Sequence, residues 1–344
     1  MQINSFGLDF DDVLILPQYS EVDSRADVNL VTTFTTPHSK RNITGIPIIA
    51  ANLDTVATFK MAKALSQFNI FTCLHKFYSE SELINFFNNA WSEYAFYTTG
   101  INQEDINKLT NIAKHCKIDK ICVDVPNGYM KKFLDTVKRI REIFPNSVLM
   151  AGNVCTYNGS KMLDNIGVDI IKVGIGSGSK CKTKDITGVG NYQLSAIDNC
   201  TFEDGLICSD GGCNKPGDVC KSFAAGASFV MLGGMFAGHS ECDGEWEYEN
   251  EIMPNNLGIP VLTGRKIKKS LKTYGMSSQE AMEKYYGGVA DYRTSEGKCI
   301  QVPYRGDVRN TVLEILGGLS SCCSYSGVND LKDLSKNAIF VKKE

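Results

Sequence analysis

The segment KVGIGSGSKCKTKDITGVG, residues 172–190, places one cysteine among glycines, lysines and hydroxyl side chains. A cysteine thiolate is a strong nucleophile, and lysines close to Cys181 in sequence would favour its thiolate form. Thr183 lies two residues further on, and alternate residues of an extended loop share a side, so its hydroxyl could pass a proton to or from the thiol. Glycine at this density lets the backbone approach a ligand closely. The segment therefore predicts a nucleophilic cysteine in a ligand-binding loop.

The same glycines also leave backbone carbonyl oxygens uncovered. Gly174, Gly176 and Gly178 alternate along the loop. Backbone carbonyls are suitable ligands for a monovalent cation. We therefore expect that this loop could bind such an ion.

Eight short apolar runs recur along the chain, and segments with helical spacing lie between most of them. The runs are residues 46–51, 71–76, 94–100, 120–125, 147–153, 169–174, 205–211 and 229–234, and the clearest helical segments are residues 58–68, 105–116 and 129–144. Buried strands that alternate with helices are typical of a parallel sheet, and eight such units favour a (β/α)8 TIM barrel. A doubly wound open sheet is the alternative, but it would carry a glycine-rich turn after an early strand, which is missing here. We therefore predict an α/β fold with a single barrel domain over residues 1–344.

Two irregularities interrupt this pattern. The sixth and seventh runs start 36 residues apart, at residues 169 and 205, and the added length contains Cys181. In a TIM barrel the loops after the strands form the catalytic face, so this enlarged sixth loop would lie there. The second irregularity is segment 239–274, rich in Glu, Asn and Lys. It predicts a long active-site flap.

Glycine pairs follow the seventh and eighth predicted strands. Gly211 and Gly212 come after Asp210, and Gly233 and Gly234 follow the eighth run. Barrels often bind phosphate in these two loops through backbone N–H groups. Asp210 could accept hydrogen bonds from sugar hydroxyls, or it could simply cap the following helix. The two pairs predict a site for a phosphate group.

The composition excludes several other classes of protein. The formal net charge is −3, so there is no basic surface that would indicate a nucleic-acid partner. No apolar run has the length of a membrane span, and the first residues do not resemble an export signal. An odd number of cysteines, 13, in a chain of this size argues against a disulfide scaffold. We expect no membrane partner and a cytoplasmic location.

Motifs along nearly the whole chain identify a family. They are LDFDDVLILP (8–17), IPIIAANLDTV (46–56), DVPNGY (124–129), MAGNV (150–154), SDGGCNKPGDV (209–219), FVMLGGMFAGH (229–239), YGMSS (274–278), GGVADYRTSEGK (287–298) and LKDLSKNAIFVK (331–342), together with the Cys181 segment. With these motifs the sequence resembles the GMP reductase branch of the IMP dehydrogenase/GMP reductase family. The resemblance implies that Cys181 attacks purine C2 of GMP, ammonia leaves, and NADPH delivers a hydride to C2 of the resulting thioimidate, which releases IMP. It also implies a homotetramer.

The resemblance assigns roles to individual positions. Thr183 and Glu296 would relay protons for the leaving amine. The substrate would contact Ser179, Asp210, Gly211, Gly212, Gly233, Gly234, Gly275, Met276, Ser277, Arg293, Thr294, Ser295 and Gly297. NADPH would contact Lys76, Asp124, Val125, Pro126, Tyr292, Ser321, Cys322, Cys323 and Ser324, with Ser24 and Arg25 supplied by a neighbouring subunit. Potassium would bind the carbonyls of Gly176, Gly178 and Cys181.

IMP dehydrogenase, which oxidises IMP to XMP with NAD, is the alternative within the family. Those enzymes usually carry CBS repeats inserted after the second or third strand, where the connections of this chain are short, so we expect no CBS insertion. Ser177 and Lys184 depart from the proline and arginine usual at these positions, and Pro126 replaces an alanine of the cofactor motif. Two further alternatives are an FMN-dependent barrel oxidoreductase and a catalytically silent nucleotide-binding protein. Neither would require Cys181, Thr183 and Glu296 together.

Overall fold

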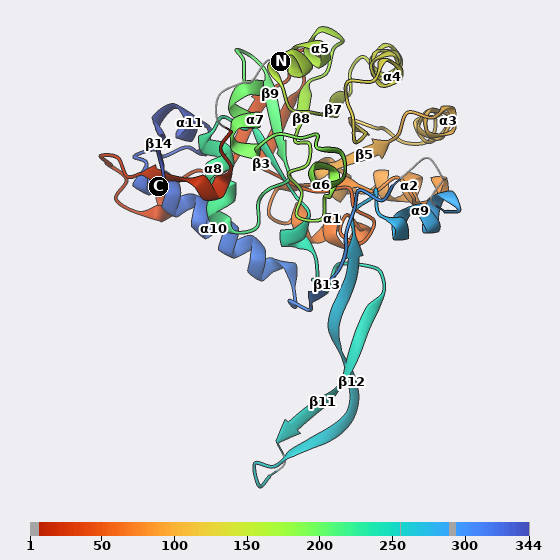
Figure 1. The fold of residues 1–344 in the computed structure, drawn as a ribbon, viewed down its shortest axis with the longest axis vertical. Helices are drawn as coiled ribbons and strands as arrows, with labels where there is room; N and C mark the ends of the chain where they lie inside the picture. Colours follow the sequence, from red (N-terminus) through yellow and green to blue (C-terminus); the bar gives the residue numbers. More distant parts are fainter. Residues whose placement is uncertain (1–6, 255, 289–293, 344) are drawn as a thin grey trace.

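Eight parallel strands close into a barrel in the computed structural model, which describes residues 7–254, 256–288 and 294–343 (Figure 1). The strands are β3 (Asn42–Ala50), β4 (Ile70–Leu74), β5 (Ala95–Thr99), β6 (Lys120–Asp124), β7 (Val148–Val154), β8 (Ile170–Val173), β9 (Leu206–Asp210) and β10 (Phe229–Leu232). Closure comes from the parallel pairing of β10 with β3, in which Val230 lies opposite Ile48. Each strand overlaps one apolar run of the sequence. The predicted (β/α)8 barrel is therefore confirmed.

Helices surround the barrel and connect its strands. They are α1 (Phe59–Ser66), α2 (Glu80–Phe87), α3 (Gln103–Ile112), α4 (Lys131–Ile143), α5 (Tyr157–Asn165), α6 (Thr183–Thr187), α7 (Gln193–Cys200), α8 (Pro216–Ala224), α9 (Gln279–Tyr286), α10 (Val308–Tyr325) and α11 (Leu334–Asn337). The connections after β4 and β5 contain α2, α3 and a short 3₁₀ turn, η3 (Ala90–Tyr94), with no additional domain. Among the described residues, no helix combines the length and the apolar character needed to cross a membrane.

Large apolar side chains fill the barrel interior because successive residues of a strand point alternately inward and outward. Phe71, Phe96 and Phe229 meet there as neighbouring rings, with centroids 6.2 Å apart for Phe71–Phe96 and 6.1 Å for Phe71–Phe229. Outward-facing strand residues pack against the helices in two further apolar clusters. The cysteines are all free thiols, and most are buried, as expected for small apolar residues of a core.

Two additional strand pairs lie outside the barrel. β1 (Val13–Leu16) pairs with β14 (Ile339–Lys342) and so joins the two ends of the chain. β2 (Thr32–Thr35) pairs antiparallel with the first residues of β3. Neither pair contributes to the carboxyl ends of the barrel strands, where the predicted site residues lie.

The predicted flap segment forms a long hairpin that projects away from the barrel (Figure 1). Its strands are β11 (Trp246–Pro254) and β12 (Pro260–Tyr274), and the end of β12 also pairs with β13 (Cys299–Pro303). Most of the hairpin is exposed, whereas residues 270–274 are largely buried against the barrel. The sheet continues through this buried end towards the Cys181 loop. A role for the hairpin as a lid stays a prediction.

Candidate active site

Cys181, Thr183 and Glu296 form a continuous chain of hydrogen bonds. The Cys181 thiol donates to Thr183 Oγ1 at 3.1 Å, and the Thr183 hydroxyl donates to Glu296 Oε2 at 2.7 Å. The Thr183 N–H also lies 3.5 Å from the sulfur. A thiol, a hydroxyl and a carboxylate in this order can move a proton away from the sulfur. Cys181 is partly exposed, so a ligand can reach it.

Glu296 reaches this position through backbone pairing with the Cys181 loop. The Lys182 N–H donates to Glu296 O, and the Lys298 N–H donates to Lys180 O, each at 2.7 Å. Cys181 itself forms an antiparallel bridge with Gly297. A Cβ atom on Gly297 would lie only 2.7 Å from the backbone nitrogen of Ser278, so this approach requires glycine. The pairing brings the nucleophile and the carboxylate together although 115 residues separate them.

The loops after β8, β9 and β10 converge beside Cys181. The Ser177 hydroxyl donates to Asp210 O at 3.0 Å. Gly211 has φ +97°, and a Cβ atom there would lie 2.9 Å from the backbone nitrogen of Gly178. A Cβ atom on Gly234 would lie 3.3 Å from Ser179 Oγ. The contacts of Gly211 and Gly234 with Gly178 and Ser179 therefore bring predicted phosphate-binding residues of three loops next to one another.

The YGMSS segment packs against the residues around Glu296. The Glu296 N–H donates to Ser277 O at 3.1 Å, and the Ser278 N–H donates to Gly275 O at 2.9 Å. The Ser295 hydroxyl accepts the N–H of Gln279 at 3.1 Å. The predicted purine-contacting residues therefore lie within two segments that contact each other, residues 274–278 and 294–298. They are Gly275, Met276, Ser277, Thr294, Ser295 and Gly297. Tyr292 and Arg293 lie outside the described residues.

A buried lysine connects two of the predicted ligand-binding carboxylates. Lys172, on β8, is 1% exposed and forms an ion pair with Asp124 at the end of β6. Its Nζ also lies 3.2 Å from Asp210 Oδ2 at the end of β9. Asn52 donates to Asp124 Oδ2 at 3.0 Å, and Asn153 donates to Asp210 Oδ2 at 2.9 Å. These residues form a polar layer across the mouth of the barrel.

The charges of this layer stabilise one another. Burial alone would raise the pKa of Asp124, but the charge and hydrogen bond of Lys172 outweigh it and lower the pKa. Burial would likewise lower the pKa of Lys172, yet Asp124 and Asp210 hold it well above its usual value. Both pKa shifts favour the charged forms, so Lys172 and Asp124 form an ionised pair. The buried Asn153 Oδ1 has no partner among the described residues, so it is an acceptor that a ligand could satisfy.

The lysines near Cys181 do not converge on the sulfur. Lys180 Nζ donates to Thr273 Oγ1 at 2.6 Å. Lys182 lines a hollow together with Lys298, Ser295 and Gly297. The Lys184 stem packs beside Gly176, and its Nζ lies 5.0 Å from the Tyr192 ring centroid. The expectation that the three lysines favour the thiolate therefore has no support from their contacts.

The predicted potassium ligands belong to one tight turn. Gly176 has φ +77°, and the Gly178 carbonyl accepts the N–H of Cys181 at 2.9 Å. A carbonyl oxygen has two lone pairs, so Gly178 O can still accept a second partner. The donor set thus fits a monovalent cation chemically, and its role as a potassium site stays a prediction.

The predicted cofactor residues fall into two groups. Lys76, Asp124, Val125 and Pro126 follow β4 and β6, and Lys76 Nζ pairs with Asp105 at 3.1 Å. Their ammonium and carboxylate groups suit the phosphates and hydroxyls of a dinucleotide. The second group is on the last turns of α10 and in the neighbouring turn η2 (Arg25–Asp27), and it comprises Ser321, Cys322, Cys323, Ser324, Ser24 and Arg25.

The second group lies away from the first within one chain. The Val308 N–H at the start of α10 donates to Glu241 Oε2 at 3.1 Å, and Ser321 follows about 20 Å further along the helix. Arg25 lies 5.9 Å from the ring centroid of Tyr325, the last residue of α10. Figure 1 shows α10 ending on the side of β14, opposite α2 and α3. The expectation that Ser321–Ser324 contact the cofactor from the same chain as Lys76 and Asp124 therefore has no support from their placement.

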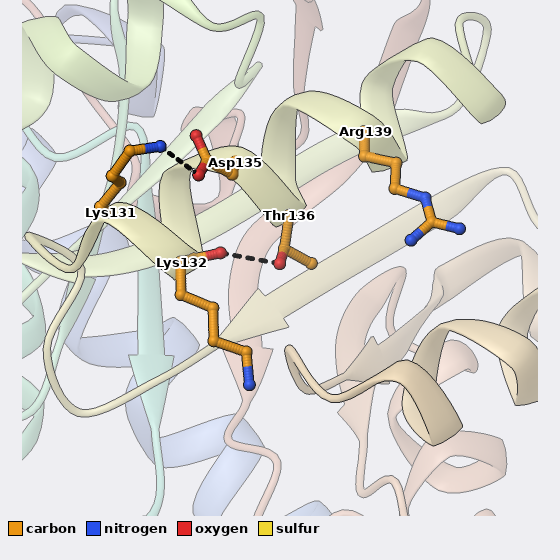
Figure 2. Close-up of a pocket in the computed structure, with 5 residues that line it drawn as sticks. All are labelled: Lys131, Lys132, Asp135, Thr136 and Arg139. Carbon is orange, nitrogen blue, oxygen red and sulfur yellow. Dashed lines mark hydrogen bonds and ion pairs between the residues drawn. The ribbon is translucent and has the colours of Figure 1, made fainter.

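A hollow on the outer side of the barrel does not belong to this site. Figure 2 shows its lining along α4, where Lys131 pairs with Asp135 at 2.6 Å and Thr136 donates to the Lys132 carbonyl at 2.7 Å. These are contacts between neighbouring turns of one exposed helix. Among the described residues, the hydrogen bonds of the lining side chains stay within α4 or reach Asn102 and Gln103, and none of them joins the Cys181 loop.

Sequence reasoning missed Lys172 and the two asparagines of the polar layer. The available signal was the charged residue in the otherwise apolar run DIIKVG, together with Asn52 and Asn153 just after or within strands. A lysine inside a barrel strand needs buried partners, and the carboxylates at neighbouring strand ends are the nearest candidates.

Comparisons with known proteins show what this chain is similar to. The family model for the IMP dehydrogenase / GMP reductase domain matches residues 7–344. Human GMP reductase 1 is 48% identical over 342 residues, which cover 97% of this chain and 94% of that protein. The GMP reductase of Onchocerca volvulus is 46% identical and covers 98% of this chain and 92% of that protein. The crystal structure of inosine 5′-monophosphate dehydrogenase from Legionella pneumophila superposes with a TM-score of 0.79 at 31% identity, covering 98% and 99% of the two chains.

Proposed function

Because the chain belongs to the IMP dehydrogenase/GMP reductase family, we propose that it is a GMP reductase, which converts GMP to IMP and ammonia with NADPH. The observation that carries the proposal is the hydrogen-bonded chain from the Cys181 thiol through Thr183 to the Glu296 carboxylate. The identity to proteins named GMP reductase, 46–48%, exceeds the 31% identity to the dehydrogenase structure and supports the reductase branch.

The substrate would bind between the loops after β8, β9 and β10. Backbone N–H groups of Gly211, Gly212, Gly233 and Gly234 would hold the phosphate, and Asp210 would accept bonds from the ribose hydroxyls. The segments around Gly275 and Ser295 would border the purine. This arrangement would hold purine C2 close to Cys181, and orientation of this kind contributes strongly to catalysis.

In the first step the Cys181 sulfur would form a bond to C2, and the bond from C2 to the amino nitrogen would break. The thiol proton would move through Thr183 Oγ1 to Glu296 and then to the departing amine, which leaves as ammonia. The purine is then held as a thioimidate on Cys181.

In the second half, NADPH would supply a hydride to C2. The C2–sulfur bond would break, IMP would leave, and Cys181 would regain a proton from solvent through Glu296 and Thr183. The balance is GMP, NADPH and one proton converted to IMP, NADP⁺ and ammonia. Lys76, Asp124, Val125 and Pro126 would hold the cofactor within one subunit, and the residues on α10 and η2 would contact it from another, which fits a homotetramer. Carbonyls of Gly176, Gly178 and Cys181 would bind potassium and stiffen the loop.

Loss of NADPH absorbance on addition of GMP, with ammonia measured in parallel, tests the proposal. We expect the wild-type protein to oxidise one NADPH for each ammonia that it releases. Cys181→Ala should lower turnover by at least about 10⁴-fold while GMP still binds, since the nucleophile is removed. Turnover retained in this variant would contradict the mechanism. Consumption of IMP with NAD⁺, without GMP reduction, would instead assign the chain to the dehydrogenase branch.

A further inference from the structure

Lys180 precedes the nucleophile, but its side chain points to the opposite side of the loop. It is only 6% exposed, and its Nζ donates to Thr273 Oγ1 at 2.6 Å. The Thr273 side chain in turn lies 2.8 Å from the hydroxyl of Thr55. Thr273 belongs to the buried end of β12, and Thr55 follows β3. One ammonium therefore joins the Cys181 loop to the base of the hairpin and to the loop after β3.

The backbone of Lys180 belongs to the pairing that aligns the proton relay. Its carbonyl accepts the N–H of Lys298, two residues after Glu296. The bridge between Cys181 and Gly297 is the next pair of this ladder. A residue whose side chain and backbone are both held can fix the position of the strand pair that carries Cys181 and Glu296.

The charge of Lys180 is not neutralised by a neighbouring carboxylate. Among the described residues it has no ion pair, and the titratable groups that face it are Asp54 from the loop after β3, Cys242 from the segment before β11, and Cys299 on β13. Burial lowers the pKa of Lys180 to about 8 despite these groups.

We propose that Lys180 is a positioning residue of the active site, whose ammonium holds the strand pair that aligns Cys181 with Thr183 and Glu296. The proposal rests on the proposed function for its kinetic consequences. A charged donor makes a hydrogen bond about twice as strong as a neutral one, so replacement of the ammonium by an uncharged side chain weakens the link to Thr273. Small displacements of reacting groups, on the order of 1 Å, can lower a rate about 10²-fold.

Lys180→Met tests the proposal because it keeps the length of the side chain and removes the charge. We expect kcat at pH 7.5 to fall at least about 10-fold, with a change of less than about 3-fold in KM for GMP. Lys182→Met is the charge-matched control, two residues away and outside the buried network, and it should leave hydrogen exchange of the Cys181 loop as in wild type.

Thr273→Val is the second variant, because it removes the acceptor with little change in volume and leaves the lysine in place. It should also lower kcat. If Lys180→Met and Thr273→Val both keep kcat within about 2-fold of wild type, the proposal is overturned.

Hydrogen exchange followed by mass spectrometry gives a readout that does not require activity. Peptides covering residues 178–184 and 294–300 should exchange at least about 3-fold faster in Lys180→Met and Thr273→Val than in wild type and Lys182→Met, since the strand pair is loosened. Unchanged exchange in both variants would overturn the positioning role, even if GMP is reduced. Faster exchange in a protein that does not reduce GMP would support the positioning role and reject the proposed function.

Discussion

The mouth of the barrel and the projecting hairpin are both rich in charge, but their charges have different surroundings. At the mouth, Lys172 is 1% exposed and contacts both Asp124 and Asp210. On the hairpin, Lys269 Nζ lies 3.2 Å from Glu247 Oε1, and the two side chains are about half exposed, at 51% and 50%. The cost of an unpaired charge depends on its distance from water. The same residue types are therefore structural in one region and dispensable in the other.

The apolar residues of the two regions differ in the same way. Leu271, at the base of the hairpin, is fully buried and lies opposite Trp246 across the two strands. Leu262, further out on the same strand, is 66% exposed. The hairpin therefore has a base that belongs to the barrel core and an outer part that does not. The buried end, including Thr273 and Tyr274, is the part that reaches the active site.

Removal of the buried lysine should have the largest effect. Lys172→Met leaves Asp124 and Asp210, which are 30% and 23% exposed, without their shared buried cation, and we expect a loss of about 3–5 kcal/mol in the free energy of unfolding. Urea denaturation at pH 7 measures it. Lys269→Met is the matched change on the hairpin and should cost less than about 1 kcal/mol. Equal losses in the two variants would contradict the distinction between the regions.

Truncation of the two leucines should separate the base of the hairpin from its outer part. Leu271→Ala should cost about 3 kcal/mol because it removes a fully buried side chain and leaves a cavity. Leu262→Ala should change the free energy of unfolding by no more than about 0.5 kcal/mol. Thermal unfolding of the two variants compares them directly. A large loss for Leu262→Ala would mean that the outer hairpin is covered in solution.

Two glycines with positive φ provide the comparison with the smallest expected effect on stability. Gly264 on the hairpin has φ +79° and open space around it, so Gly264→Ala should cost only the conformational strain, about 1 kcal/mol, and leave GMP reduction intact. Gly211 has φ +97°, and a Cβ atom there would lie 2.6 Å from Ser177 Oγ. Gly211→Ala should therefore lower kcat/KM for GMP by more than about 10-fold. Similar kinetic effects of the two changes would show that the loop after β9 does not contact the substrate.

Local patterns in the sequence were enough to predict the barrel strands. Runs such as KICVDV and FVMLGG are apolar because both faces of a barrel strand are covered, and this property is visible without any knowledge of partners. The neighbourhood of Cys181 and Thr183 was also predicted, but from an extended loop that the structure does not contain. Thr183 begins α6, and Lys182 has φ −113° and ψ 7°, so a turn of the backbone brings the hydroxyl to the sulfur. The helical segments at α1, α3 and α4 followed from their 3.6-residue period.

Partners that are distant in sequence were not predictable from such patterns. The resemblance to a family, rather than spacing, linked Glu296 to Cys181, and the structure shows the backbone pairing that joins them. From the sequence, the lysines of the glycine-rich loop were expected to surround the Cys181 thiol. In the structure, the Lys180 side chain instead donates a hydrogen bond to Thr273. The direction of a side chain in a loop depends on which cavity is available to it, and that cavity is made by other elements.

The sequence by itself determined the strands, because a buried strand shows as a short apolar run. It also determined the residue types of the nucleophile and its relay, and the glycines whose backbone freedom lets loops approach one another. Only the tertiary structure decided that Lys172 serves two carboxylates, that the base of the hairpin borders the site while its outer part leaves the barrel, and that the residues on α10 lie away from Lys76. Those outcomes depend on closure of the barrel. Closure brings together strand ends and loops that are up to two hundred residues apart, and no local pattern specifies the distance or the direction at which they meet.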